Sequence, residues 1–286
     1  MGWLISIGMR IYDRNPKTYG LFRKLFFGEK GENNKLLIIL QIIGYTFVLP
    51  ILNHHAATEI ERIHNDSSVF CFGADDSRVS FFLPDLDLKG GELIQNRIYL
   101  EQNYFENREL TKVKNYILEH AIILDIGANI GNHSVFFMLE CGAEKVYAFE
   151  PTPHTLELLN KNIELNGLND KCVIMPYALG SENTKCSIIV EQRDAGSNRT
   201  MVDNAGAINM VTLDSVLDDN VDFIKIDVEG FEYDVLIGGQ NLIQNKKPII
   251  YIEIFPENYD RVNDLLTGWG YSQIEKFQKD YIYKFV

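Results

Sequence analysis

The stretch from residue 121 to residue 150, AIILDIGANIGNHSVFFMLECGAEKVYAFE, constrains the fold of this chain more than any other segment. A short apolar run ends at Asp125, a turn bounded by Gly127 and Gly131 follows, and a second apolar run ends at Glu150. The pattern predicts a strand, a glycine loop, a helix and a second strand, with an acid at the carboxyl end of each strand. Such a unit binds a nucleoside-bearing ligand at one edge of a parallel sheet.

The spacing of the loop residues indicates which ligand this edge binds. A dinucleotide loop reads G-x-G-x-x-G and holds a pyrophosphate at a helix N-terminus, whereas this loop reads D-x-G-x-x-x-G from Asp125 to Gly131. A carboxylate beside the loop repels a pyrophosphate but attracts the cationic aminoacyl-sulfonium end of S-adenosylmethionine. Glu150 lies 25 residues beyond Asp125, near the spacing of an acid that binds ribose hydroxyls. The alternative interpretation is a structural Asp that caps the next helix.

Charge and cysteine content restrict the classes of partner. The chain has a net charge of −13, and because residues 1–35 carry +4, the remainder carries −17. So acidic a body repels phosphate backbones, so we do not expect a nucleic-acid substrate. The four cysteines show no C-x-x-C pair, which favours free thiols in a reducing compartment over a zinc site or a disulfide framework.

The first 65 residues differ in character from the rest, and we predict an N-terminal helical extension (residues 1–65) ahead of a catalytic domain (residues 66–286). Leu36 to Leu52 form a run of 17 residues without a charge, which is at the short limit for a membrane span. The basic residues before the run favour a cytoplasmic location, at the inner face of the membrane if the run binds lipid. The alternative is a helix that packs on the catalytic domain, and Pro50 would end or break a span.

Strands and helices alternate through the rest of the chain. Two short β-type runs, residues 69–72 and 79–83, predict a hairpin before the glycine loop, and residues 94–119 have a helical pattern. After Glu150 we expect a helix over residues 155–166 and strands at 173–175, 187–190, 208–213, 223–227 and 249–254. Residues 191–206 are polar and predict a substrate loop. The chain ends in a predicted hairpin, residues 271–286.

A second cluster of charge follows the apolar run at residues 223–226. The next positions include Asp227, Glu229 and Glu232, and strand alternation places Lys225, Asp227 and Glu229 on one side. Charges that leave a buried strand are costly unless they meet a ligand, a partner or solvent. Because parallel strands end at the same edge of a sheet, we expect these groups beside the glycine loop. The alternative is an ion pair between Lys225 and Asp227, with the glutamates favouring the start of a helix.

These motifs, in this order, resemble the FkbM family of S-adenosylmethionine-dependent methyltransferases. The resemblance spans roughly residues 95–255. It rests on the motifs ILDIGANIGNHSVFF, YAFEP, the N-x-x-L-N-G pattern of residues 162–167, ALG at residues 178–180, TLD at residues 212–214 and IKIDVEGFE. It implies an α/β class I methyltransferase fold: a Rossmann-like, mostly parallel seven-stranded sheet with helices on both faces. It also implies O-methylation of a hydroxyl on a sugar or another small-molecule or glycan acceptor, as in polysaccharide biosynthesis.

The resemblance also assigns residues to the site. Phe105-Glu106 resembles the acid that the family has upstream of the glycine loop, although this acid could equally cap the helix that follows. His133 stands where the family accepts several residue types. The residues assigned to the cofactor by the resemblance are Asp125, Gly127, Asn129, Gly131, Glu150, Ala178 and Asp227.

Methyl transfer to a hydroxyl requires a positioned acceptor and benefits from a base that removes the hydroxyl proton. The predicted catalytic residues are Asp227, Glu229 and Glu253, the last inside the apolar run YIEIF, with His133 as a further candidate base. No set of His, Asp and Glu residues has the spacing typical of metal ligands, so we expect no obligatory metal.

Two other functions remain open at this point. A methyltransferase-like fold can serve without catalysis as a partner of glycan-assembly enzymes, but the acids Asp125, Glu150 and Asp227 favour a working site. A nicotinamide-dependent oxidoreductase is the other alternative, and the missing G-x-G-x-x-G motif disfavours it.

Overall fold

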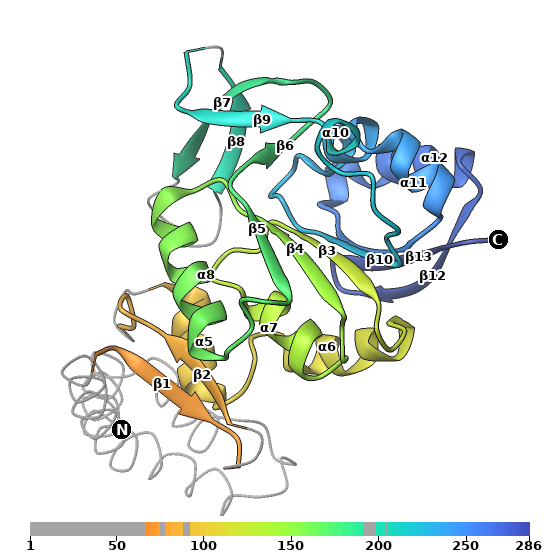
Figure 1. Cartoon of the computed structure of the whole chain (residues 1–286). Helices are drawn as coiled ribbons and strands as arrows, with labels where there is room; N and C mark the ends of the chain where they lie inside the picture. Colours follow the sequence, from red (N-terminus) through yellow and green to blue (C-terminus); the bar gives the residue numbers. More distant parts are fainter. Residues whose placement is uncertain (1–66, 75–77, 88–91, 191–197, 204) are drawn as a thin grey trace, which may run out of the picture. The chain divides into compact units, whose positions relative to one another are not determined.

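A seven-stranded sheet carries the strand ends that the sequence singles out (Figure 1). The computed structural model describes residues 67–74, 78–87, 92–190, 198–203 and 205–286. The strands of the sheet are β3 (Ile122–Ile126), β4 (Lys145–Phe149), β5 (Cys172–Met175), β10 (Phe223–Ile226), β11 (Ile249–Glu253), β12 (Tyr271–Phe277) and β13 (Asp280–Phe285). Their order is β12-β13-β11-β10-β3-β4-β5. The pairs among β5, β4, β3, β10 and β11 are parallel, and β13 and β12 add in antiparallel orientation. The predicted mostly parallel sheet is confirmed.

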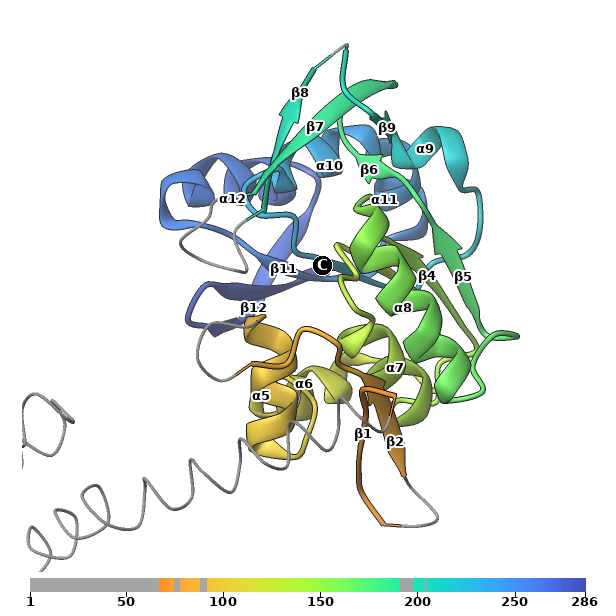
Figure 2. The ribbon, with the colours of Figure 1, turned by 90° about the vertical axis from the view of Figure 1, so that its left-hand side faces the viewer.

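Helices cover both faces of this sheet, as predicted (Figure 2). Ile224 and Ile226 pack in one buried cluster with residues of α10, α11 and α12, whereas the ring of Phe223 lies 5.8 Å from that of Phe137 in α7. Neighbouring strand residues point to opposite faces, so these helices lie on opposite sides. The helices are α5 (Leu93–Glu101), α6 (Asn107–Val113), α7 (Asn132–Leu139), α8 (Pro153–Leu165), α9 (Leu213–Val216), α10 (Glu232–Gly238), α11 (Gln240–Lys246) and α12 (Tyr259–Gly268).

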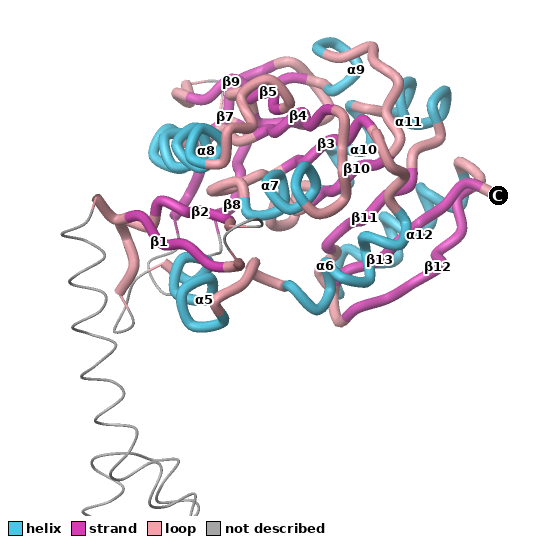
Figure 3. The backbone as a smooth tube through the Cα atoms, turned by 60° about the horizontal axis from the view of Figure 1, so that its bottom comes forward, coloured by secondary structure: helices cyan, strands magenta, loops and turns pink. Residues whose placement is uncertain are grey.

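The strands of the main sheet lie side by side (Figure 3), and their register brings the carboxyl ends of the parallel strands to one edge. Ile226 of β10 pairs with Ile126 of β3 and with Ile252 of β11, and Ile126 pairs with Phe149 of β4. The residues after these positions therefore lie in one row, which runs Glu150, Gly127, Asp227 and Glu253. On the far side of Glu253 the row continues to Asp280, its partner in β13. Residues that are distant in the sequence thus meet because of strand register.

Two smaller sheets flank the main one. The predicted hairpin before the glycine loop is present as β1 (Val69–Phe72) and β2 (Val79–Phe82). A second sheet has the order β6-β9-β7-β8, from β6 (Ala178–Leu179), β7 (Thr184–Val190), β8 (Asn198–Val202) and β9 (Ile208–Val211).

The substrate-loop prediction for residues 191–206 is wrong in part. Residues 198–202 of that stretch form β8, which pairs with β7 in antiparallel orientation. The backbone hydrogen bonds of β7 gave a partner to a sequence that is polar and weakly patterned. The predicted strand over 208–213 also ends earlier, because Leu213 begins α9.

The predicted N-terminal extension, including the apolar run from Leu36 to Leu52, lies outside the described residues. In the part of the chain from Ser67 onward that the structure describes, no helix is long and apolar enough to cross a membrane. All four cysteines are free, as expected.

Candidate active site

The glycine loop packs directly against the end of β10. Gly127 has a φ of +77°, and a Cβ built on it would lie 1.8 Å from the backbone oxygen of Asp227. Neither the conformation nor the space admits a side chain. Gly131 also has a positive φ, and its position faces Leu159 of α8. The loop therefore requires glycine in order to touch two neighbouring elements.

Every backbone N–H group of the loop already has an acceptor within the protein. Gly127 N and Ala128 N donate to the oxygen of Phe149 at 3.0 and 2.9 Å, and Gly131 N donates to Ala128 O at 2.9 Å. Asn129 N donates to Glu150 Oε2 at 3.1 Å, and Ile130 N donates to Asn129 Oδ1 at 2.7 Å. A phosphate-binding loop needs free N–H groups that point at the anion. This loop offers none of its five, which argues against a dinucleotide.

Lys225 joins the loop to the charged end of β10. Its side chain is 3% exposed, and Nζ donates to the oxygen of Gly127 at 2.7 Å. The same nitrogen lies 3.4 Å from Asp125 Oδ1 and 3.4 Å from Asp227 Oδ2. Burial would lower the pKa of Lys225, but the carboxylates of Asp227 and Asp125 outweigh it and raise that pKa. Lys225 is therefore a fixed cation between two acids, as the predicted ion pair required.

The acids that end β3 and β4 are both held by protein partners. Asp125 is completely buried, and its Oδ2 accepts a hydrogen bond of 2.6 Å from the hydroxyl of Ser134. Glu150 is 6% exposed, and besides Asn129 N it accepts the N–H of Thr152 at 2.9 Å. Burial raises the pKa of Glu150, and these N–H groups oppose the rise. Glu150 therefore shapes the loop, and each of its oxygens keeps acceptor capacity for a ligand hydroxyl.

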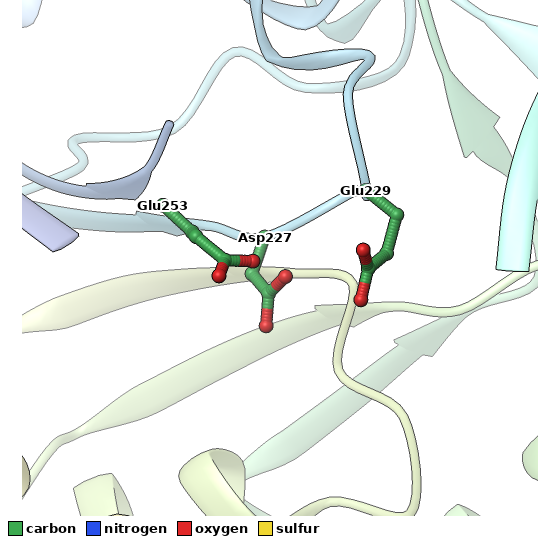
Figure 4. Close-up of side chains that lie close together, drawn as sticks. All are labelled: Asp227, Glu229 and Glu253. Atoms are coloured by element: carbon green, nitrogen blue, oxygen red, sulfur yellow. The ribbon is translucent and has the colours of Figure 1, made fainter. Parts of the chain in front are cut away.

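Three carboxylates converge where β10 and β11 end (Figure 4). Asp227, Glu229 and Glu253 each place an oxygen within 4.8 Å of the other two, and all three residues are half-buried. We call these three residues the acid cluster. Lys225 neutralises part of it from the side of Asp227, and Lys279 Nζ lies 3.4 Å from Glu253 Oε1. Two lysines thus face three acids.

The charges of the acid cluster are unevenly held. Burial raises the pKa of Glu253 to about 8, helped by the charge of Asp227. Burial would also raise the pKa of Asp227, but Lys225 and a hydrogen bond from Glu253 outweigh it and lower that pKa. Burial and the charge of Asp227 raise the pKa of Glu229 to about 7. Near neutral pH, Asp227 is ionised, Glu253 holds a proton and Glu229 exchanges one.

The segment before α6 lies against the start of α7. Phe105 N donates to Asn132 Oδ1 at 2.9 Å, and Asn132 Nδ2 donates back to the oxygen of Phe105 at 3.1 Å. Next to this pair, Glu106 has a φ of +60°, and its Oε2 lies 3.5 Å from His133 Nε2. The side chain of Glu106 makes no capping hydrogen bond to α6. The structure therefore does not support the capping interpretation of this acid, and its place in the site stays a prediction.

The acid cluster is also the group of residues, within the described ranges, whose oxygens lie close enough to share a cation. Sequence spacing did not indicate such a group, because Glu253 comes from a different strand. Acids commonly approach one another without a metal. Here the proton on Glu253 and the two lysines already reduce the repulsion among the three carboxyl groups.

The family is decided by the match of residues 125–273 to the methyltransferase FkbM domain. The chain belongs to the FkbM family of methyltransferases. The hexuronic acid methyltransferase AglP of Haloferax volcanii is 28% identical over 141 residues, which are 46% of this chain and 55% of AglP. A tRNA wybutosine-synthesizing protein 2/3/4 of Arabidopsis thaliana is 33% identical over 67 residues, 23% of this chain and 7% of that protein. The matches thus cover about half of AglP and a small part of the plant protein.

Among solved structures, the FkbM methyltransferase of Methylobacillus flagellatus is similar to this chain. It has 21% sequence identity and a TM-score of 0.41, over 58% of this chain and 43% of that one.

S-adenosylmethionine is the cofactor of this FkbM-family chain. The residues present fit it, since the loop has no free N–H group for a phosphate while the acid cluster suits a cation. The predicted cofactor residues Gly127, Glu150 and Asp227 lie in the row at the sheet edge. Asp125 lies one level deeper, where it contacts Ser134 and Lys225. Their individual roles stay predictions.

The structure also locates Glu229 and Ala178, two further predicted site residues. β10 ends at Ile226, and Glu229 has a φ of +52°. Its carboxylate meets Asp227 because the backbone turns, so the predicted alternation through Glu229 is wrong. Ala178 lies in β6 of the small sheet, where it packs with Cys186 and Met210.

Lys279 and Asp280 lie beside the acid cluster and were not predicted as site residues from the sequence. Both belong to the end hairpin, whose β13 pairs with β11 and sets Asp280 opposite Glu253. Burial, followed by the charge of Glu106, raises the pKa of Asp280 to about 8. The run of polar residues at the tip, Gln278 to Asp280, was the available signal, but nothing local shows which strand the hairpin joins.

Proposed function

We propose that this FkbM-family methyltransferase transfers the methyl group of S-adenosylmethionine to a hydroxyl of a sugar or glycan. The acid cluster carries the proposal, because it offers carboxylates with pKa values of about 7 and about 8 at the sheet edge that also holds the glycine loop. A sugar hydroxyl is a weak acid, and a base that titrates near neutral pH is suited to accept its proton.

Glu229 is the residue to which we assign the base. Within the described ranges its carboxylate has neither a hydrogen bond nor an ion pair, and its pKa of about 7 leaves much of it ionised at neutral pH. Asp227 is held ionised by Lys225 and is a weaker base. Glu253 is protonated at neutral pH and donates to Asp227, which fixes both side chains. We therefore assign these two residues to positioning and to the electrostatic field of the site.

The chemistry is a displacement at carbon. S-adenosylmethionine supplies a methyl group on a cationic sulfur. With it bound, the acceptor oxygen would displace the sulfur from the methyl carbon, S-adenosylhomocysteine would leave with the electron pair of the carbon–sulfur bond, and Glu229 would accept the hydroxyl proton. The protein contributes by orienting the acceptor and by excluding water, which can supply much of the rate enhancement.

The similarity to AglP supports a saccharide acceptor, because that relative is named for hexuronic acid methylation. The tRNA-modifying relatives match this chain over shorter segments, such as 67 residues for the Arabidopsis protein. The acid cluster would repel a phosphate backbone. A saccharide is therefore the acceptor class that fits the site better.

An acceptor panel tests the proposal. The full-length protein is incubated with methyl-labelled S-adenosylmethionine and, separately, with neutral oligosaccharides, uronic-acid oligosaccharides, tRNA and a protein extract. We expect label on a saccharide oxygen, located by mass spectrometry, and none on the same saccharide with its hydroxyls acetylated. Label that accumulates on tRNA or on protein instead would refute the proposal.

A further inference from the structure

A pocket of about 390 Å³ lies beside the acid cluster, between the end hairpin and the segment that follows β11. Its floor includes Ile254, the residue directly after Glu253. The lining includes two lysines and no acid. The polar and aromatic residues of the lining are Tyr259, Gln273, Lys276, Gln278, Lys279 and Tyr281.

One lysine connects the pocket to the acid cluster. Lys279 lines the pocket, and its ammonium lies 3.4 Å from Glu253 Oε1. The backbone oxygen of Lys279 accepts a hydrogen bond of 2.8 Å from Ile254 N, which fixes the hairpin tip against the end of β11. Lys279 is therefore the side chain through which the pocket and the acid cluster meet.

Lys276 is a cation without a carboxylate partner in the described part of the chain. Its Nζ lies 5.0 Å from the ring centre of Tyr281 and 6.0 Å from that of Tyr259. The neutral rings attract the ammonium but do not neutralise its charge. In a chain with a net charge of −13, a pocket lined by two lysines and no acid is a local site for an anion.

The remaining lining suits a sugar ring. The hydroxyl of Tyr259 donates to Gln273 Oε1 at 2.8 Å, so the amide nitrogen of Gln273 is the group that can donate to a ligand oxygen. The rings of Tyr259 and Tyr281 have centres 5.0 Å apart and are tilted by 38°. Apolar ring faces next to a few fixed polar groups are typical of a small-molecule site.

We propose that this pocket binds an anionic group, a carboxylate or a phosphate, carried by the acceptor saccharide. The inference rests on the proposed function and names the substrate class. An anion on the acceptor is repelled by Asp227 and Glu229 and attracted by Lys276 and Lys279. The separation of charge therefore orients the acceptor: its anionic group lies in the pocket and a hydroxyl faces the acid cluster.

The test measures charge preference directly. The full-length protein with S-adenosylhomocysteine is titrated with methyl β-glucuronide, methyl β-glucoside and glucose 1-phosphate, by NMR or calorimetry. We expect the glucuronide or the sugar phosphate to bind roughly tenfold more tightly than the neutral glucoside. Lys276→Gln should reduce this preference to about twofold, because one charged donor is lost. The matched control is Lys284→Gln, an exposed lysine of the same hairpin outside the pocket, which should leave the preference unchanged.

The outcomes separate this inference from the proposed function. Tighter binding of glucose 1-phosphate than of the glucuronide identifies phosphate as the anionic group, and the reverse order identifies carboxylate. Charge-dependent binding without methyl transfer to any saccharide supports the pocket and removes the proposed function. Equal affinity for charged and neutral probes, a preference that survives Lys276→Gln, or binding of neither anionic probe would overturn the pocket assignment, even if saccharides are methylated.

Discussion

The glycine loop and the acid cluster lie side by side at one sheet edge, yet they are held in opposite ways. In the loop, all five N–H groups from Gly127 to Gly131 have protein acceptors, and Glu150 accepts two of the N–H groups that shape this edge. In the acid cluster, Glu229 has no hydrogen bond or ion pair within the described ranges, and its pKa is raised to about 7. The N–H groups of the loop have partners before any ligand binds, whereas the carboxylate of Glu229 in the acid cluster has none among the described residues.

This difference indicates that the glycine loop serves as a framework and that the acid cluster supplies the reactive groups. A satisfied loop keeps its shape without the cofactor, so it can offer a preformed surface. Carboxylates that burial leaves short of partners have raised pKa values, which suits proton transfer and costs stability. Lys225 touches both regions, since it donates to the oxygen of Gly127 and lies 3.4 Å from Asp227. Changes at this junction should therefore have the largest effects.

Replacing Lys225 with methionine should lower the free energy of unfolding by about 3–5 kcal/mol, the usual effect of removing one partner from a buried ion pair. The reason is that Asp125, which is completely buried, would lose its cationic partner. Urea unfolding followed by circular dichroism measures the change. Adding Asp125→Asn to Lys225→Met should recover part of the loss, whereas Lys284→Met, on an exposed lysine, should have little effect. A small loss in the single variant would show that Lys225 does not join the two regions.

Gly127→Ala should destabilise the contact between the glycine loop and the end of β10. A Cβ there would lie 1.8 Å from the backbone oxygen of Asp227, at a φ of +77°. The left-handed conformation costs about 1–2 kcal/mol and overpacking about 1–3 kcal/mol, so we expect a loss of about 2–5 kcal/mol. Gly167→Ala is the matched control, because its φ of +66° is similar and nothing lies within 4 Å of its Cβ. If both variants lose the same stability, the close approach of loop and β10 is unimportant.

The sequence predicts the loop better than the acid cluster, and the physical reason is locality. Asp125, Gly127 and Glu150 lie within one strand–loop–helix–strand unit, so the period of the apolar residues is enough to place them. The acid cluster depends on register between β10 and β11 and on the left-handed backbone of Glu229. A glutamate at positive φ is uncommon, and no residue pattern predicted this conformation.

The end hairpin shows the same limit. Its strands were predictable from β-type residues between turns, but its place beside β11 was not. That placement brings Lys279 to Glu253 and forms the pocket with Lys276. The charge of the acceptor site is therefore set by residues that only the tertiary fold brings together.

Glu229→Gln tests the reactive role of the acid cluster. The amide keeps the shape but cannot accept a proton, so we expect turnover to fall about a hundredfold with little change in cofactor affinity. In the unchanged protein the rate should rise with pH up to about 7 and then level off, because the base must be deprotonated. The variant should lose that rise. Glu257→Gln, at an exposed glutamate after β11, should keep both the rate and the pH profile. A pH profile that Glu229→Gln leaves intact would move the base to another residue.

Glu150→Ala tests the prediction that Glu150 binds the ribose of S-adenosylmethionine. Glu150 keeps acceptor capacity for a ligand hydroxyl while it holds Asn129 N. Losing a charged acceptor should cost roughly 1.5–3 kcal/mol, which is about ten- to a hundredfold in the affinity for S-adenosylmethionine. Calorimetric titration gives the value, with Glu157→Ala on the exposed face of α8 as the control. Unchanged affinity would remove Glu150 from the cofactor site.

The smallest effect concerns stability against pH at Asp280, which stands at the end of the row of acids. Its pKa is raised to about 8 in the folded protein by burial and by the charge of Glu106, above the ordinary value of about 4 in an unfolded chain. The folded state therefore holds a proton that the unfolded state releases, so stability is full below about pH 4 and falls as pH rises through 8. Removing this group with Asp280→Asn should flatten the fall. At pH 9 we expect the variant to melt at a higher temperature than the unchanged protein, by about 2–4 °C for each 1 kcal/mol that the charged carboxylate costs. Thermal melts from pH 5 to pH 9 at constant ionic strength measure both slopes, and Asp264→Asn, exposed on α12, should follow the unchanged protein. Parallel slopes for Asp280→Asn and the unchanged protein would show that the pKa of Asp280 is not raised in the folded protein.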